Sequence, residues 1–244
     1  MLYYANKDQV SYGEAIGILL LDTYIPFPPG DVGNATTYSF PVRYKVVKGA
    51  SIERIINEQD PSLLEPFILA GWELVQEGVK AITGDCGFMI LFQEQLCKEF
   101  PVPVFMSSLL QIPFISQMLG PGGKVGIITA DSRGFTEKHL QAAGVDEGML
   151  VKVAGMQDQK NFYDAILAEK GELNFVEVQK EVVQVVKELV RKDDKIKAVL
   201  LECSDLPPYA AAVQEAVNLP VFDFTTMINH VFSALVRKPF EGFM

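Results

Sequence analysis

The amino-acid sequence predicts an α/β fold of two similar halves, each built around a parallel sheet. Short apolar runs rich in Val and Ile alternate with longer segments of helical periodicity, which is the pattern of βαβ units around a parallel sheet. The chain also repeats itself: residues 80–86 align with 197–203, and residues 103–105 align with 220–222 at the same offset. Duplicated α/β units usually face one another across a ligand-binding cleft.

The expected strands are the short apolar runs, at residues 15–21, 42–47, 80–85, 102–106, 124–129, 150–153, 196–202 and 220–222. A helix is expected after Asp60, because Pro61 suits a first helical turn and an apolar stripe follows it up to Gly78. Another helix is expected from Asn174, where Glu177 stands three residues later as in a capping box.

Two further segments complete the expected arrangement. Residues 88–100 have helical periodicity and contain Cys97, which we expect to be a packing residue of that helix. Residues 24–34 contain three prolines and two glycines, which remove hydrogen-bond donors and loosen the backbone. This segment is therefore expected to be a long loop after the first strand.

The composition excludes several classes of function. The chain has 244 residues, 49% of them hydrophobic, with 21 basic and 31 acidic side chains and a net charge of −10. This charge disfavours binding to nucleic acid or to anionic membranes. The apolar stretch at 16–21 is too short to span a membrane and follows no basic run, so we expect a cytoplasmic protein without a membrane segment. The three cysteines lack metal-site or disulfide spacing, which predicts free thiols and no metal.

Cys86 and Cys203 occupy equivalent positions in the repeat, each at the carboxyl end of an expected strand. Ligands of open parallel sheets bind at this end of the strands, and the start of a following helix favours a thiolate. A single free cysteine is most often a small buried hydrophobe. A duplicated one is less easily explained by packing, so we expect both thiols to face a small molecule. Cys97 has no counterpart, because Gln214 stands at the equivalent position.

The segments GDCGF at 84–88 and LECSDLPPY at 201–209 resemble the aspartate/glutamate/hydantoin racemase superfamily. The resemblance covers essentially the whole chain. It includes Asp22 at the end of the first expected strand and Thr129 at the end of the strand that opens the second half.

This resemblance implies two similar α/β lobes, each a doubly wound parallel sheet, related by a pseudo-twofold axis with the active site in the cleft between them. One lobe would be formed by residues 1–108 with 222–244 and the other by residues 109–221. It implies that Cys86 and Cys203 are the catalytic pair, one from each lobe, and that no cofactor takes part. The substrate would be a small carboxylate or a hydantoin, and a homo-oligomer is possible.

The chemistry of such enzymes explains why two thiols are needed. Inverting a carbon requires a base on one face and an acid on the other. A thiol suits both roles, because its pKa of about 8.5 can be lowered enough to make a base while its partner stays protonated. The resulting carbanion spreads charge into the adjacent carboxylate, which needs hydrogen-bond donors placed in advance.

Five residues near the cysteines are candidates for binding the substrate. The backbone N–H groups of Gly87 and Ser204 lie at expected helix starts, and the Ser204 and Thr129 hydroxyls could add hydrogen bonds. Ser107 is a weaker candidate, since hydroxyls at strand ends more often cap the next helix. Asp22 would orient a substrate amine or a thiol, or else cap the loop that follows it.

The chain departs from the pattern of glutamate racemases. Those enzymes commonly carry Asn-Thr after the first cysteine and Thr-His after the second, whereas this chain has Gly-Phe at 87–88 and Ser-Asp at 204–205. A more apolar pocket is therefore expected, and Asp205 is expected either to orient or relay protons in place of the His or to cap a helix. Asp85 and Glu202 should face away from the cysteines if strand alternation continues; facing inward, they would raise the thiol pKa.

These observations favour a cofactor-independent amino-acid or hydantoin racemase or epimerase. One alternative is a cis–trans isomerase of the maleate type, in which one thiol adds to the alkene. Decarboxylation of an arylmalonate-like acid is disfavoured by the presence of both cysteines. A two-lobed carboxylate-binding protein without turnover is the alternative from another class, and a thiol redox enzyme is a poorer one because it requires the sulfurs within bonding distance.

Overall fold

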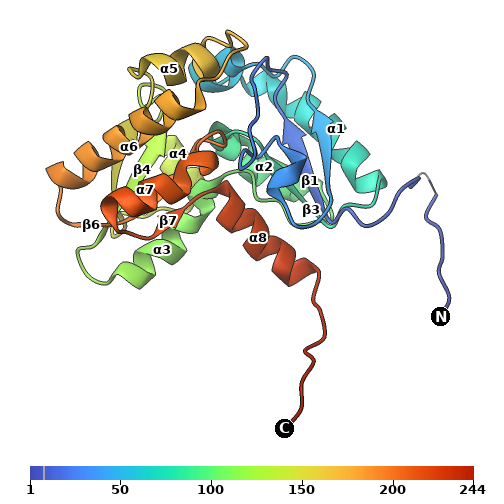
Figure 1. The fold of residues 1–244 in the computed structure, drawn as a ribbon. Helices are drawn as coiled ribbons and strands as arrows, with labels where there is room; N and C mark the ends of the chain where they lie inside the picture. Colours follow the sequence, from blue (N-terminus) through green and yellow to red (C-terminus); the bar gives the residue numbers. More distant parts are fainter. Residues whose placement is uncertain (8) are drawn as a thin grey trace.

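The computed structural model describes residues 1–7 and 9–244 and contains two separate parallel sheets (Figure 1). In the first sheet the strand order is β2-β1-β3, with β1 at Ile16–Leu20, β2 at Val42–Val46 and β3 at Ala81–Gly84. The strand expected at 102–106 is wrong: only Val104 pairs, in a single bridge to Ile82. The predicted α/β class with two parallel sheets is confirmed.

The second sheet repeats the order of the first and adds one strand. Its order is β5-β4-β6-β7, formed by β4 (Lys124–Thr129), β5 (Leu150–Gly155), β6 (Ile196–Leu201) and β7 (Val221–Phe222). In both sheets the earliest strand is central, flanked by the next strand on one side and the third on the other. Phe222 pairs with Leu200 and so belongs to this sheet rather than to the tail that returns to the first lobe.

Helices cover both faces of each sheet. The first sheet packs against α1 (Leu64–Gln76) and, through a separate apolar cluster, against α8 (Phe224–Leu235). The second packs against α6 (Phe175–Lys192) and α7 (Ala210–Val217) on one face, and against α3 (Ile112–Leu119) and α4 (Glu137–Ala142) on the other. The C-terminal helix thus packs against the first sheet, while the division of the chain into lobes stays a prediction.

Shorter helical turns connect these elements. They are the 3-10 turns at Ala35–Thr37, Pro61–Leu63, Gly87–Phe92, Ser108–Gln111 and Pro207–Tyr209, the α-helical segments α2 (Gln93–Glu99) and α5 (Lys160–Phe162), and the π-helical turns η2 (Glu53–Asn57) and η6 (Tyr163–Leu167). The helix expected at 88–100 is therefore a 3-10 turn followed by α2. Cys97 in α2 is exposed, so the expectation that it is a packing residue of this helix is wrong.

Local signals explain where several elements begin and end. The Asn174 side chain accepts a hydrogen bond from the backbone N–H of Glu177 at 3.3 Å, which caps α6 as the sequence predicts. The side chain of Asp60 caps the turn that opens at Pro61. The segment 24–34 contains neither helix nor strand, which confirms the expected loop.

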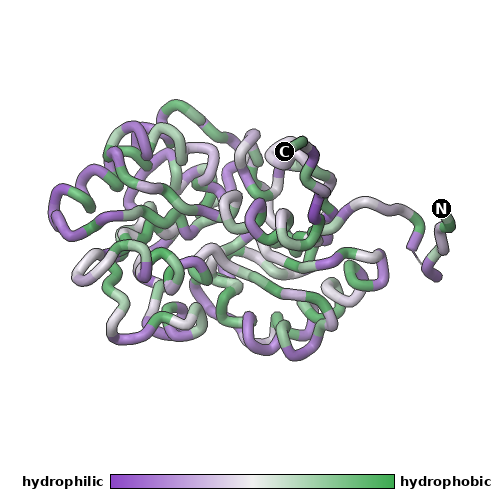
Figure 2. The backbone as a smooth tube through the Cα atoms, turned by 90° about the horizontal axis from the view of Figure 1, so that it is seen from below, coloured by the Kyte–Doolittle hydropathy of each residue, from purple (hydrophilic) through white to green (hydrophobic). Residues whose placement is uncertain are grey.

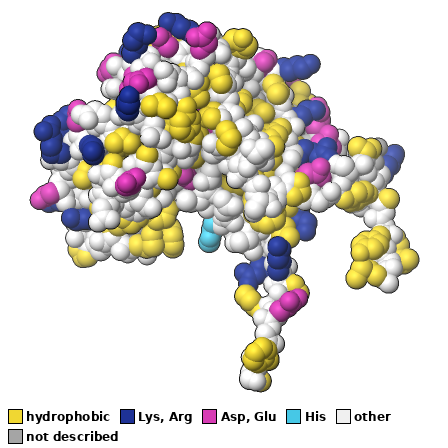
Figure 3. All heavy atoms as spheres, viewed as in Figure 1, with side chains coloured by type: hydrophobic (Ala, Val, Ile, Leu, Met, Phe, Trp, Pro, Cys, Tyr) yellow, Lys and Arg dark blue, Asp and Glu magenta, His cyan; other side chains and the backbone are white. Residues whose placement is uncertain are grey.

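Hydropathy follows this architecture. The hydrophobic stretches lie mostly inside each lobe and the hydrophilic ones gather at outer turns (Figure 2). The two terminal segments project from the body, and their apolar residues are exposed, as for Phe240 and Phe243 (Figures 1 and 3). Within the described part of the chain, every helix is too short or too polar to cross a lipid bilayer.

The two lobes also share features that the sequence comparison does not show. The π-helical turns η2 and η6 stand 110 residues apart in the chain. Among the described residues, three non-glycine residues have positive φ, and two of them, Gln59 (48°) and Glu169 (49°), follow these turns at the same separation. Since such geometry is uncommon, its recurrence is independent support for two equivalent lobes.

Candidate active site

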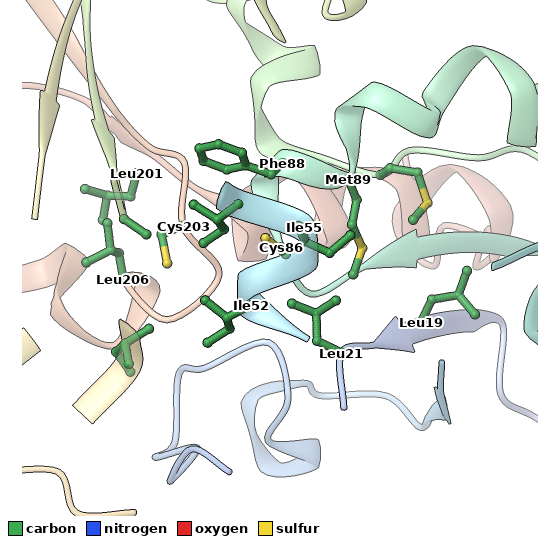
Figure 4. Packing of buried hydrophobic residues seen from close by; sticks show 14 of the residues in the cluster. Leu19, Leu21, Ile52, Ile55, Cys86, Phe88, Met89, Leu201, Cys203 and Leu206 are labelled. Carbon is green, nitrogen blue, oxygen red and sulfur yellow. The ribbon is translucent and has the colours of Figure 1, made fainter. Parts of the chain in front are cut away.

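A narrow cavity lies where the strands of both sheets end. Leu21, Cys86, Ala130 and Cys203 line it, and each follows a strand of one sheet by one or two residues. The cavity has a volume of about 30 Å³, enough for roughly one or two water molecules. A substrate must therefore displace side chains that cover the cavity. Figure 4 shows both cysteines among the apolar residues around this point.

Both cysteines are buried thiols. Cys86 has an extended backbone and precedes the 3-10 turn at Gly87–Phe92. Burial raises the pKa of the Cys86 thiol well above its usual range, and the carboxyl groups of Glu202 and Asp85 raise it further. Burial likewise raises the pKa of Cys203, and Asp205 is the strongest of the charges that add to this rise. Without a ligand, both sulfurs are therefore protonated at neutral pH.

The Cys203 thiol has a proton acceptor beside it. Its Sγ donates a hydrogen bond to Oδ2 of Asp205 at 3.2 Å, and Asp205 also lines the cavity. Asp31 lies next to Asp205 and is only 1% exposed; burial and the Asp205 charge raise the pKa of Asp31. The structure thus places Asp205 beside a cavity thiol, whereas Asp31 was not foreseen. The signal for Asp31 was its place in the Pro- and Gly-rich loop after the first strand.

Asp85 and Glu202 both line the cavity, contrary to the expectation that they face away from it. The reason is that β3 ends at Gly84 and β6 ends at Leu201, so strand alternation no longer governs the next residue. Burial raises the pKa of each carboxyl group to about 8. Asp85 accepts hydrogen bonds from the backbone N–H of Leu21 at 3.0 and 3.2 Å.

The titratable side chains that line the cavity are acids and thiols. Among the described residues, its lining includes three acidic side chains and no Lys, Arg or His. Apolar residues complete it, among them Ile52, Ile56 and Phe88, which agrees with the more apolar pocket expected from Phe88. A lining of this kind suits a small molecule with apolar groups and a positive charge.

The structure brings some of the expected binding residues to the cavity and leaves others outside it. Gly87 and Ser204 line it. The Ser204 hydroxyl, however, donates to the backbone carbonyl of Asp85 and so links the two lobes. Thr129 is buried but does not line the cavity, and Ser107 caps the turn at Ser108–Gln111 through the N–H of Leu109.

Asp22 is also placed outside the cavity. Its side chain is exposed and accepts a hydrogen bond from the backbone N–H of Gly49 at 3.3 Å. Asp22 therefore links the end of β1 to the turn after β2, a contact that the sequence did not predict.

Two equivalent contacts hold the lobes together over the cavity. The Gln59 side chain donates to the carbonyl of Gly134 at 2.7 Å, and the Glu169 side chain accepts from the N–H of Tyr24 at 2.8 Å. In each contact, the residue with positive φ beyond a π-helical turn reaches the backbone of the other half of the chain. Ile56 and its counterpart Ile166 lie on these turns and line the cavity. We call the two contacts the latches.

Curated relatives cover nearly the whole chain. The sequence is 32% identical to a dimethylsulfoniopropionate lyase of Durusdinium sp. clade D, over 97% of this chain and 80% of the relative. It is 31% identical to dimethylsulfoniopropionate lyase 3 of Emiliania huxleyi, over 98% of this chain and 65% of the relative. The chain thus spans about two thirds of the length of the Emiliania protein.

Solved structures with the same fold are more distant in sequence. Allantoin racemase from Pseudomonas fluorescens superposes with a TM-score of 0.60 at 15% identity, over 91% of both chains. Aspartate racemase from Picrophilus torridus superposes with a TM-score of 0.54 at 14% identity, over 91% of this chain and 94% of that one. The sequence pattern of the Asp/Glu/Hydantoin racemase family matches residues 41–229. The chain therefore belongs to the Asp/Glu/Hydantoin racemase family.

Proposed function

We propose that this protein is a lyase that cleaves dimethylsulfoniopropionate into dimethyl sulfide and acrylate. The observation that carries the proposal is the pair of buried thiols in a cavity lined by carboxyl groups and by no cationic side chain of the described residues. The curated relatives named as dimethylsulfoniopropionate lyases support the choice of substrate.

The charge of the substrate decides between the candidate reactions. Aspartate and glutamate carry a net negative charge, which would raise the thiol pKa. Dimethylsulfoniopropionate is a zwitterion without net charge, and its sulfonium group, placed near a thiol, lowers the thiol pKa and favours the thiolate. The bound substrate would then itself promote formation of the thiolate that acts as the base. The methyl groups on its sulfur match the apolar part of the lining.

The proposed reaction begins at Cys203. When the sulfonium binds, the Cys203 thiol passes its proton to Asp205, to which it is already hydrogen-bonded. The thiolate then removes a proton from the carbon next to the substrate carboxylate. The electrons of that C–H bond form the C=C bond of acrylate, and the C–S bond breaks with its electron pair leaving on dimethyl sulfide. Asp205 finally releases its proton to solvent, so one proton is formed in each turnover.

Racemisation of a small 2-substituted carboxylate is the second candidate. It is favoured by the equivalent placement of Cys86 and Cys203 at the ends of corresponding strands and in one cavity. Such a pair could remove a proton on one face of a carbon and return it on the other. The first step, removal of a proton next to a carboxylate, is the same in both reactions.

A substrate panel in deuterated water separates the two candidates and the other reactions of the family. The panel contains dimethylsulfoniopropionate, aspartate, glutamate, a hydantoin and maleate, followed by NMR and by headspace analysis. Dimethyl sulfide and acrylate are the expected products. Deuterium exchange with loss of chirality, and no dimethyl sulfide, would establish racemisation instead. Conversion of maleate would indicate an isomerase, and stabilisation by a ligand without any chemistry would indicate a binding protein.

A further inference from the structure

We propose that Glu202 is a catalytic residue that acts as a neutral carboxylic acid and donates a hydrogen bond to the carboxylate of the substrate. This inference rests on the proposed function, because it names the group that stabilises the charge formed in that reaction. It assigns a role to a lining acid whose carboxyl oxygens have no hydrogen-bond partner among the described residues.

The first argument is the isolation of the Glu202 carboxyl group. The residue is 0% exposed and lines the cavity. Neither Oε1 nor Oε2 has a hydrogen-bond partner among the residues that the structure describes; the neighbouring Thr129 hydroxyl, which lowers the pKa of Glu202, has none either. A buried polar group without a partner costs roughly 1–3 kcal/mol. A ligand that accepts a hydrogen bond from Glu202 would remove this cost, and the cavity is where such a ligand would bind.

The second argument is a comparison of the two lobes. Asp85 stands at the position of the first lobe that corresponds to Glu202 in the repeat. Both oxygens of Asp85 are satisfied by the backbone N–H of Leu21. Glu202 is longer by one methylene group and makes no such bond in its own lobe. At this position, Asp85 therefore stabilises the end of a strand in the first lobe, whereas the carboxyl group of Glu202 in the second lobe is available to a ligand.

The third argument is the position of Glu202 relative to Cys86. A Cβ atom added to Gly87 would lie 1.9 Å from Oε1 and 2.3 Å from Cδ of Glu202. The carboxyl group therefore packs directly against the backbone next to Cys86, and only glycine leaves room for it. Of the neighbouring charges, Glu202 has the largest effect on the pKa of Cys86. The acid and the thiols consequently line the same cavity.

The chemistry requires a neutral acid here. Removing the proton next to a carboxylate adds negative charge to that carboxylate in the transition state, and a donor placed in advance stabilises it. An ionised Glu202 would repel this charge. Burial raises the pKa of Glu202 to about 8, so the neutral form predominates at pH 7. The cavity lining described above offers no Lys, Arg or His that could do the same.

Other titratable groups face Glu202 and must be separated from it. They are Cys86 and Asp85 from the first lobe, and Cys203 and Asp205 from the second. The pKa of Asp85 is also raised to about 8. A loss of activity above this pH could therefore come from either acid, and only variants can assign it.

The test compares Glu202→Gln, which keeps a hydrogen-bond donor, with Glu202→Leu, which does not. Glu94→Gln on the exposed side of α2 is the control. Removing a donor of this kind typically lowers kcat by about 10²–10³. We expect that loss in Glu202→Leu, a loss below about tenfold in Glu202→Gln, and parent activity in Glu94→Gln. Equal loss in both Glu202 variants, or full activity in Glu202→Leu, would overturn the proposal.

The pH dependence provides a readout that a merely structural role would not change. In the parent, kcat/KM should fall as the pH rises through about 8, because Glu202 ionises. Glu202→Gln should lack this fall, whereas Asp85→Asn should retain it. A fall that persists in Glu202→Gln and disappears in Asp85→Asn would assign it to Asp85 and contradict the role of Glu202.

Binding of propionate tests Glu202 without any turnover. If the parent cleaves no dimethylsulfoniopropionate, the proposed function is wrong, but Glu202 can still donate to a carboxylate. Propionate should then bind the parent at pH 6.5 at least tenfold more tightly than Glu202→Leu, as about 1.4 kcal/mol corresponds to a factor of ten. Equal affinities, with both proteins folded as judged by circular dichroism, would overturn the inference on its own.

Discussion

Replacing Gly87 with alanine tests the contact between the lobes at the centre of the cavity. The added Cβ would lie 1.9 Å from Glu202 Oε1 and 2.7 Å from the backbone carbonyl oxygen of Glu202. The first contact could be relieved by a side-chain rotation, but the second involves backbone and requires the strand ends to move apart. Gly87 has no positive φ, so the effect of the substitution is steric.

The size of the effect follows from this geometry. Overpacking a buried site typically costs 1–3 kcal/mol, and the clash with backbone places Gly87→Ala at about 2 kcal/mol or more. For a chain of this length, that corresponds to a decrease in Tm of roughly 4–8 °C. Because a displacement of about 1 Å at a reacting centre can cost a factor of 10², turnover should fall by at least tenfold.

Calorimetry and the dimethyl sulfide assay measure both effects. Gly148→Ala is the matched control, because its added Cβ would meet only the side chain of Asp146, at 3.2 Å. We expect the control to keep the Tm and the activity of the parent. A Gly87→Ala protein with unchanged Tm and rate would refute the view that Glu202 packs against residue 87.

Three further predictions concern the same account. Glu202 has a pKa of about 8 in the folded protein against an ordinary 4.5, so between these pH values the folded state keeps a proton that the unfolded chain loses, and the free energy of unfolding should fall with rising pH by at most about 5 kcal/mol. Urea titrations at pH 5 and pH 8 should show a smaller fall for Glu202→Gln than for the parent, and an equal fall would contradict this. Glu169→Ala removes the latch to Tyr24, so in a Cys97→Ser background, which leaves only the two cavity thiols, these thiols should react with a disulfide reagent several-fold faster than they do when Glu169 is present. An unchanged rate would show that the latch does not limit access to the cavity. Asn174→Ala removes the cap of α6 and should cost about 1 kcal/mol, measured by thermal unfolding; a change below about 0.3 kcal/mol would mean that the cap is replaced by solvent.

Much of the fold could be predicted from the sequence because the signals are local and repeated. Alternating apolar runs and helical stripes indicated the parallel sheets, and the duplicated motif placed Cys86 and Cys203 at corresponding strand ends. The strand expected at 102–106 was wrong because an apolar run also suits a buried connection that forms one bridge. The equivalence of the two π-helical turns was not visible, since their sequences, ERIIN and YDAIL, have little in common.

The site could be predicted only in part, because its geometry depends on contacts between the lobes. Strand alternation predicted that Asp85 and Glu202 would face away, but alternation ends where the strand ends. Asp31 reaches Asp205 through the fold of a loop, which no local pattern specifies. Asp22 carried the family resemblance, yet in this structure its side chain is exposed and bonds to Gly49.

The central claim is that a cavity thiol removes the proton next to the substrate carboxylate. The most direct measurement is the rate of dimethyl sulfide release by Cys203→Ser, compared with Cys97→Ser, whose sulfur is exposed on α2. We predict that Cys203→Ser loses at least a factor of 10³ while remaining folded, because a serine hydroxyl is a far weaker base than a thiolate. Cys97→Ser should keep the parent rate. Release of dimethyl sulfide at the same rate by both variants would contradict the account.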